Sequence, residues 1–209
     1  MEQTYAIELK NITKRFGKIV ANDGINLKVK RGEILSLLGE NGSGKTTLMN
    51  MISGIYFPDE GHILVDGKAV SIRSPKDSFD LGIGMIHQHF KLIDVMTAAE
   101  NIILGLKGNA VLDMKKVHKD IQELVDRYGF DLDPAQKVYT MSVSQKQTVE
   151  IVKMLYRGAN ILILDEPTAV LTPQEVDKLF EVLRNMRDDG RAIIIITHKL
   201  NEVLECCYS

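Results

Sequence analysis

One segment of eight residues constrains this chain more than any other, because it specifies both a backbone path and a chemistry. Residues 39–46 read GENGSGKT and match the pattern G-x-x-x-x-G-K-[ST] at every required position. The glycines let successive backbone N–H groups point inward and form a nest for phosphate oxygens at the start of a helix. The residues expected to bind the phosphates are Gly39, Asn41, Gly42, Ser43, Gly44, Lys45, Thr46 and Thr47.

The flanking sequence favours a phosphate loop over an accidental glycine-rich turn. An apolar run, Ile34–Leu38, precedes the motif and another, Leu48–Ile52, follows it, as a strand and a helix would. Lys45 is expected to neutralise the β and γ phosphates, and the hydroxyl of Thr46 is expected to ligate Mg²⁺. The loop therefore predicts a nucleotide and a magnesium ion as ligands.

Composition restricts the class of protein further. The 209 residues are 44% hydrophobic and 26% charged, which is typical of a globular protein with a sizeable core. The 26 basic and 28 acidic residues give a net charge of −2, which argues against a protein that coats DNA. No apolar run approaches the roughly 20 residues that span a bilayer, and no secretory signal is visible. The adjacent Cys206 and Cys207 cannot form a disulfide framework, so a reducing cytoplasm is the expected compartment.

Short apolar runs alternate with helical patterns, which predicts an α/β fold. Four nearly all-apolar runs are expected to form a mostly parallel sheet that is buried on both faces. Their length and flanking glycines favour strands over buried helical segments. The four runs are Ile34–Leu38, Ile83–Ile86, Ile161–Leu164 and Ala192–Ile196.

The first part of the chain predicts a small antiparallel sheet beside the main one. Its strands are expected at Tyr5–Leu9, Ile19–Ala21, Ile25–Val29 and Ile63–Val65, with turns at 22–24, 58–61 and 66–67.

Helix signals are clear in the second half of the chain. Residues 113–157 read as mostly helical with a break near 131–134, and we expect them to belong to a helical subdomain inserted between two core strands. Pro173 fits the first position of a helix that Gly190 would close. Two pairs have capping-box spacing, Thr97 with Glu100 and Thr172 with Glu175.

Each predicted core strand leads into residues that carry chemistry, at the edge where open parallel sheets bind ligands. The first strand runs into the phosphate loop, and the others run into Gln88, into Asp165 and Glu166, and into His198. We expect Asp165 to hold Mg²⁺ through its water shell and Glu166 to orient or deprotonate an attacking water. Gln88 would ligate Mg²⁺ or touch that water, and His198 would hydrogen-bond the γ-phosphate. Either of these two residues alone would be unremarkable.

As a set, these motifs resemble the nucleotide-binding domain of an ABC transporter. The phosphate loop, Gln88, SVSQ at 142–145, ILILDEP at 161–167 and His198 occur in that family's order and spacing. The resemblance extends over essentially all 209 residues. It implies a phosphate-loop NTPase core that hydrolyses ATP with Mg²⁺.

The resemblance also implies roles outside the phosphate loop. Phe16 resembles the aromatic residue that stacks on adenine, and a core phenylalanine at a strand edge is the alternative. Ser142, Ser144 and Gln145 resemble the family signature, which contacts the γ-phosphate bound to a second ABC ATPase domain. ATP would then be sandwiched between two such domains, in a homodimer or a tandem pair.

A division of the chain and further partners follow from the same resemblance. The nucleotide-binding core would occupy about 1–90 and 158–209, and the helical subdomain about 91–157 of a single ABC-type domain. The helical subdomain would dock on an integral membrane permease at the cytoplasmic face of the membrane, with Gln88 linking that contact to the site. A substrate-binding protein would take part indirectly, and nucleic acid would not.

Finer matches resemble the ATPases of simple-sugar and nucleoside importers, with the nucleoside type closer. They lie at 84–90, 165–175 and 197–203. This subgroup resemblance has no chemical test within the chain, because no residue here would touch the transported solute.

Three features depart from the family pattern. Ser144 stands where the signature usually has glycine, and its Cβ restricts positive φ, although its hydroxyl can still donate to phosphate. Thr172 stands where many members have aspartate, and it would cap the next helix. The chain ends soon after His198, where the family continues. We therefore expect a truncated domain that lacks its C-terminal end and a second ATPase domain, with an exposed sheet edge.

Several functions remain open at this point. The leading hypothesis is an ATPase that drives uptake of a nucleoside or simple sugar. The second is a half-site that binds ATP but does not turn over without a second domain. A soluble ABC-type ATPase acting on DNA or ribosomes would need a coiled-coil insertion or a basic arm, and neither is visible. A nucleotide kinase shares the phosphate loop, but the acids Asp165 and Glu166 and the distal His198 fit an ATPase better.

Overall fold

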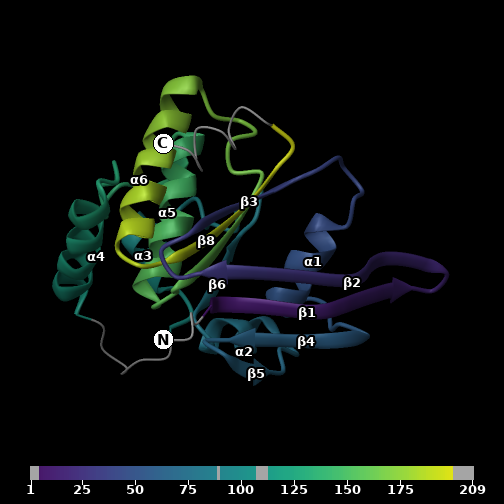
Figure 1. Cartoon of the computed structure of the whole chain (residues 1–209). Helices are drawn as coiled ribbons and strands as arrows, with labels where there is room; N and C mark the ends of the chain where they lie inside the picture. The colour runs from purple at the N-terminus through teal and green to yellow at the C-terminus, as the bar shows by residue number, and fades with distance from the viewer. Residues whose placement is uncertain (1–4, 89, 107–112, 200–209) are drawn as a thin grey trace.

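Two four-stranded sheets organise the fold (Figure 1). The computed structural model describes residues 5–88, 90–106 and 113–199. The antiparallel sheet has the order β2-β1-β4-β5, and the parallel sheet has the order β3-β8-β7-β6, which confirms the predicted α/β fold class. The strands are β1 (Tyr5–Phe16), β2 (Ile19–Lys30), β3 (Ile34–Leu38), β4 (Glu60–Val65), β5 (Lys68–Val70), β6 (Ile83–Ile86), β7 (Ile161–Asp165) and β8 (Ala192–Thr197).

The antiparallel sheet differs from its prediction in the length of its strands. Strands β1 and β2 each run for 12 residues, so the turn predicted at 22–24 was wrong and these residues lie inside β2. The pairing register shifts along the β1–β2 ladder, for example between Leu9 and Ile12. Such irregularities accommodate Asn11 and Gly24, whose φ values of 52° and 56° are positive, without ending either strand.

The four predicted core strands are confirmed, and β7 and β8 each extend one residue further. Their register aligns the carboxyl ends, because Leu38 pairs with Thr197 in one ladder and Asp165 pairs with Ile196 in the next. Whatever follows these strands therefore emerges at one edge of the sheet.

Two helices begin where their capping signals predict, whereas α2 was not predicted and the predicted break near 131–134 extends from the end of α4 to the start of α5. Both predicted capping boxes are confirmed, and Pro173 is the first residue of a helix whose end Gly190 follows with φ 84°. No helix in the described part of the chain has the length and hydrophobicity needed to cross a membrane. The helices are α1 (Lys45–Ile52), α2 (Pro75–Asp80), α3 (Ala98–Ile103), α4 (Met114–Tyr128), α5 (Val143–Tyr156) and α6 (Pro173–Asp188), with a 3₁₀ turn at Val138–Thr140.

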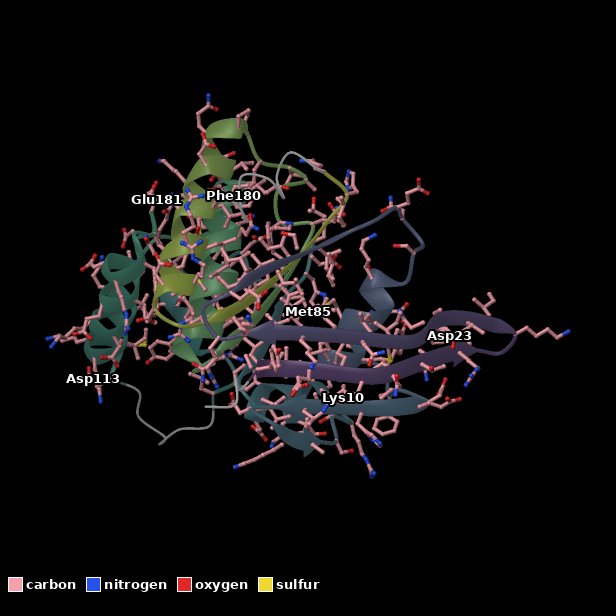
Figure 2. All side chains as sticks on the ribbon, viewed as in Figure 1. Lys10, Asp23, Met85, Asp113, Phe180 and Glu181 are labelled. Atoms are coloured by element: carbon pink, nitrogen blue, oxygen red, sulfur yellow. The ribbon has the colours of Figure 1, made fainter. Side chains whose placement is uncertain are left out.

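The parallel sheet is the middle of three layers, because its side chains alternate between two hydrophobic clusters. In β7, Ile161 and Ile163 pack with α1 and the antiparallel sheet, whereas Leu162 packs with α3–α6. Figure 1 shows α3–α6 grouped on the side of the parallel sheet away from β1, β2 and β4. On α6, Phe180 is buried in this layer and its neighbour Glu181 is exposed (Figure 2).

Two expectations stay untested by this architecture. The division into a core and a helical subdomain at about 91–157 remains a prediction. The end of the third subgroup motif, at 200–203, and the residues from Cys206 to Ser209 lie outside the described residues.

The antiparallel sheet approaches the phosphate loop most closely at Gly44. Its φ is 87°, and a Cβ built there would lie 2.4 Å from the backbone oxygen of Ala21 in β2. Gly42 has the same φ, but a Cβ there would meet nothing within 4 Å. Only glycine therefore lets the loop and β2 pack at this distance.

We expect Gly44→Ala to lower the free energy of unfolding by about 1–3 kcal/mol more than Gly42→Ala, because overpacking against a backbone atom cannot be relieved by a rotamer change. Urea unfolding followed by circular dichroism would measure both variants. Equal losses would show that the strain of positive φ alone, and not the approach of β2, requires glycine at this position.

Candidate nucleotide-binding site

The structure brings most of the predicted site residues to one cavity, at the carboxyl edge of the parallel sheet. The cavity has a volume of about 450 Å³ and is walled by the phosphate loop, the ends of β6 and β7 and the first residues of β2. Its lining residues are Ile19, Val20, Ala21, Asn41, Gly42, Gly44, Lys45, Thr46, Thr47, Gln88, Asp165, Glu166 and Ile196.

The phosphate loop has the backbone that anion binding needs. Gly42 and Gly44 both have φ 87°, and α1 begins directly after Gly44 with no side chain capping its N–H groups. These amides and the helix dipole favour an anion at this end of α1. The ammonium of Lys45 lies over the loop and donates to the backbone oxygens of Gly39 at 2.6 Å and Glu40 at 2.8 Å. It also contacts the hydroxyl of Ser43 at 3.1 Å.

The oxygen ligands of the cavity fit a magnesium ion. Thr46 offers a hydroxyl, Gln88 an amide oxygen and Asp165 a carboxylate, and all three line the same cavity. Oxygen-only sets of this kind suit Mg²⁺, which also keeps several of its waters. Burial raises the pKa of Asp165, and the neighbouring charge of Glu166 raises it further, while His87 and Lys45 act in the opposite direction. The site therefore holds negative charge that a cation would stabilise.

Glu166 has an unusual conformation and an incomplete set of partners. Its φ is 49°, in the left-handed region that non-glycine residues rarely adopt, and its N–H donates to the Ile196 backbone oxygen at 2.9 Å. One carboxylate oxygen, Oε1, lies 2.9 Å from Nδ1 of His198. The other, Oε2, is buried and has no hydrogen-bond partner among the described residues. His198 thus reaches the site through Glu166.

Seven predicted residues are not among those that line this cavity, namely Phe16, Gly39, Ser43, Ser142, Ser144, Gln145 and His198. Phe16 lies at the end of β1, 42% exposed, and its ring packs edge-on against Tyr56 at a centroid distance of 5.1 Å. The signature residues Ser142, Ser144 and Gln145 line a separate cavity of about 450 Å³ beside α6. Their predicted contacts with nucleotide therefore remain predictions.

The signature residues form the start of α5. Ser142 is the N-cap, and its hydroxyl accepts a hydrogen bond from the backbone N–H of Gln145 at 3.2 Å. Ser144 lies in the first turn of this helix and is not among the described residues with positive φ. A serine in place of glycine therefore causes no backbone strain here.

Asn22 was missed as a functional candidate, because the sequence around it was interpreted as a turn. Its side chain is buried in β2, and its Nδ2 donates to the backbone oxygen of Gly44 at 3.2 Å. The amide therefore helps to hold the phosphate loop against the antiparallel sheet. No local sequence pattern predicts this contact, because Asn22 and Gly44 are 22 residues apart in the chain.

We expect Asp165→Asn to raise the melting temperature of the nucleotide-free chain by a few degrees at neutral pH, because it removes a carboxylate that burial makes unfavourable. A carboxyl whose pKa is raised on folding becomes less destabilising as it is protonated, so the difference should shrink as the pH falls through this pKa.

Calorimetry over a pH series would measure this effect, with Asp177→Asn, on the exposed side of α6, as the control for loss of an acid. A lower melting temperature for Asp165→Asn at all pH values would contradict the expectation.

Comparisons with known proteins agree with this geometry. The nucleoside import ATP-binding protein NupA of Lactococcus lactis subsp. cremoris is 52% identical over 205 residues, which cover 97% of this chain and 40% of that protein. The chain thus spans about two fifths of the length of this curated relative.

Solved structures show the same fold. An ATP-binding cassette of an ABC transporter in its ADP conformation superposes with a TM-score of 0.86 at 26% identity, covering 97% of this chain and 85% of that one. A dimeric bacterial ABC transporter cassette superposes with a TM-score of 0.77 at 29% identity, covering 94% and 89%.

The sequence profile of the family described as ABC transporter matches residues 22–169, which is more than half of the chain. This span includes the phosphate loop, Gln88, the start of α5 and the acids that follow β7. The chain belongs to the ABC transporter family.

Proposed function

We propose that this chain binds ATP with Mg²⁺ and hydrolyses it to drive the uptake of a solute through a membrane permease. One observation carries the proposal: the phosphate loop, Gln88, Asp165 and Glu166 line one cavity at the edge of the sheet where parallel strands end. A phosphate nest with a hard-cation site and a carboxylate beside it is the combination that phosphoryl transfer to water requires.

Each residue has a distinct part in the proposed reaction. The loop amides and Lys45 bind and orient the phosphates, and Thr46, Gln88 and Asp165 hold Mg²⁺, which neutralises charge on the phosphate oxygens. Glu166 accepts the proton of the attacking water, because its Oε2 is buried and has no protein partner among the described residues. His198 holds the other oxygen of this carboxylate, which supports a role in orienting Glu166 as well as the γ-phosphate.

The separate position of the signature residues supports a second domain as partner. Ser142 and Gln145 lie at a cavity of their own, away from the phosphate loop of the same chain. A site completed by the signature of another ABC domain would account for this separation, and the dimeric structure of a related cassette supports such pairing. If the second domain is absent, the chain would instead be a half-site that binds ATP without turnover.

The nature of the solute is inferred from similarity. The similarity to a nucleoside import protein favours a nucleoside, with a simple sugar as the alternative. The chain would then lie peripherally at the cytoplasmic face of the membrane, against the permease.

We expect Lys45→Ala to weaken ATP binding about 10- to 100-fold, because a charge-assisted contact to the phosphates is lost. Titration with a fluorescent ATP analogue would measure the affinity, with Lys68→Ala, an exposed lysine of β5, as the control. Unchanged affinity in Lys45→Ala would rule out a direct contact between Lys45 and phosphate.

We expect Glu166→Gln to bind ATP as tightly as the original chain but to lose turnover about 10²- to 10⁴-fold, because the amide cannot accept the proton of water. Steady-state phosphate release would measure turnover, and size-exclusion chromatography with ATP would show a trapped dimer. The exposed Glu123→Gln on α4 provides the matched control. Full turnover by Glu166→Gln would remove Glu166 as the base.

A further inference from the structure

The turn that follows β7 holds Glu166 in a conformation that its sequence does not favour. Its φ of 49° lies in the left-handed region, and the residue that follows is Pro167. A residue before proline prefers an extended backbone, and a non-glycine residue at positive φ is strained. Such a conformation persists only where surrounding contacts over-determine it.

Three of the hydrogen bonds in this described turn hold the backbone of Glu166 and Pro167. The N–H of Glu166 donates to the Ile196 backbone oxygen of β8 at 2.9 Å, and the N–H of Ala169 donates back to the Glu166 oxygen at 3.3 Å. The third comes from α5, where Nε2 of Gln147 donates to the Pro167 backbone oxygen at 2.9 Å. This last bond fixes the peptide plane between Pro167 and Thr168, one peptide beyond the strained residue.

Gln147 is a buried residue that supports the turn after β7 from inside the protein. The residue is 5% exposed, and its bond to Pro167 is buried, so water cannot replace the donor without a change in packing. Gln147 lines the cavity of the signature residues, and it also lines a small cavity with Asp165 and Glu166. One amide therefore lies between the start of α5 and the acids after β7.

We propose that Gln147 is a positioning residue for Glu166, acting through the backbone oxygen of Pro167. When the amide holds this oxygen, the peptide between Pro167 and Thr168 cannot rotate. Because the ring of Pro167 fixes its own φ, the backbone before it is held too, and Glu166 keeps the left-handed φ that aims its carboxylate into the nucleotide cavity. Without the donor, Glu166 relaxes toward negative φ and its carboxylate moves away from the attacking water. This role rests on the proposed function, because it is defined by the hydrolysis that Glu166 promotes.

The proposal separates turnover from binding. The phosphate loop lies between β3 and α1, and the nucleotide cavity is lined by neither Gln147 nor any other residue of α5. Loss of the amide should therefore leave the phosphates bound as before while the base is misplaced. Misplacement of a reacting group by about 1 Å can reduce a rate about 100-fold.

The test compares Gln147→Met with Gln122→Met. Methionine has nearly the length and helix propensity of glutamine but cannot donate a hydrogen bond. Gln122 is exposed on α4 and donates to Asp126 of its own helix at 2.8 Å, so the same chemical change occurs away from the site. Gln147→Glu, which keeps the shape and loses the donor, is the second variant if the first folds poorly.

We expect Gln147→Met to lower kcat about 10- to 100-fold with the KM for ATP unchanged, whereas Gln122→Met matches the original chain. Amide hydrogen exchange without nucleotide gives an independent readout. The N–H of Ala169 should lose protection in Gln147→Met, because its acceptor is the Glu166 oxygen, while the amides of Ile151 and Val152 in α5 stay protected.

The outcomes separate this proposal from the proposed function. Original kcat and original protection of Ala169 in Gln147→Met would overturn the positioning role and leave hydrolysis standing. Loss of protection throughout α5, with kcat and KM both changed, would also overturn it, because Gln147 would then be a general structural residue. If the unmodified chain shows no turnover beside a second domain, the proposed function fails, and the exchange of Ala169 still tests the contact.

Discussion

The register of the parallel sheet is the constraint on which the rest of the structure depends. Pairing of Leu38 with Thr197 and of Asp165 with Ile196 brings the ends of three strands to one line. A slip of one residue would turn every side chain of a strand to the other face and move Asp165 away from the phosphate loop. The central strands β7 and β8 are buried on both faces and pack in two different clusters, so this register is strongly fixed. The positions of the site residues are therefore set by the packing of the two hydrophobic clusters, which extend far beyond the site.

Much of this architecture could be predicted from local signals. The phosphate loop, the four core strands and both capping boxes depend on residues close together in sequence, and all were confirmed as elements. The lengths of β1 and β2 could not be predicted, because β-bulges absorb residues that would otherwise form a turn. Asn22 was missed for a related reason, because its role depends on a hydrogen bond from β2 to Gly44 in the phosphate loop, which is distant in sequence. The positive φ of Glu166 could not be predicted either, because glutamate is not a residue type that favours this conformation.

The residues proposed for binding and those proposed for turnover lie in different parts of the fold. The loop before α1 is the proposed phosphate site, whereas the acids after β7 are held by β8, by α5 and by the imidazole of His198. The start of α5 carries the signature residues, and Gln147 of the same helix bonds to the backbone just after the acids, less than two turns later. A movement of α5 relative to the core would therefore change the catalytic turn before it changed the phosphate loop. This arrangement suits a domain whose partner controls when hydrolysis takes place.

The strained conformation of Glu166 has a consequence for which substitutions such a domain accumulates during evolution. Its backbone is strained, and its Oε2 is buried with no hydrogen-bond partner among the described residues, so both features lower the stability of the fold. Under the proposed function, substitution at this position is opposed by selection for activity more than by selection for stability. A gene copy released from its task would lose this residue early and keep a well-folded chain. Sound folding in a relative of this protein is thus no sign that the relative still works.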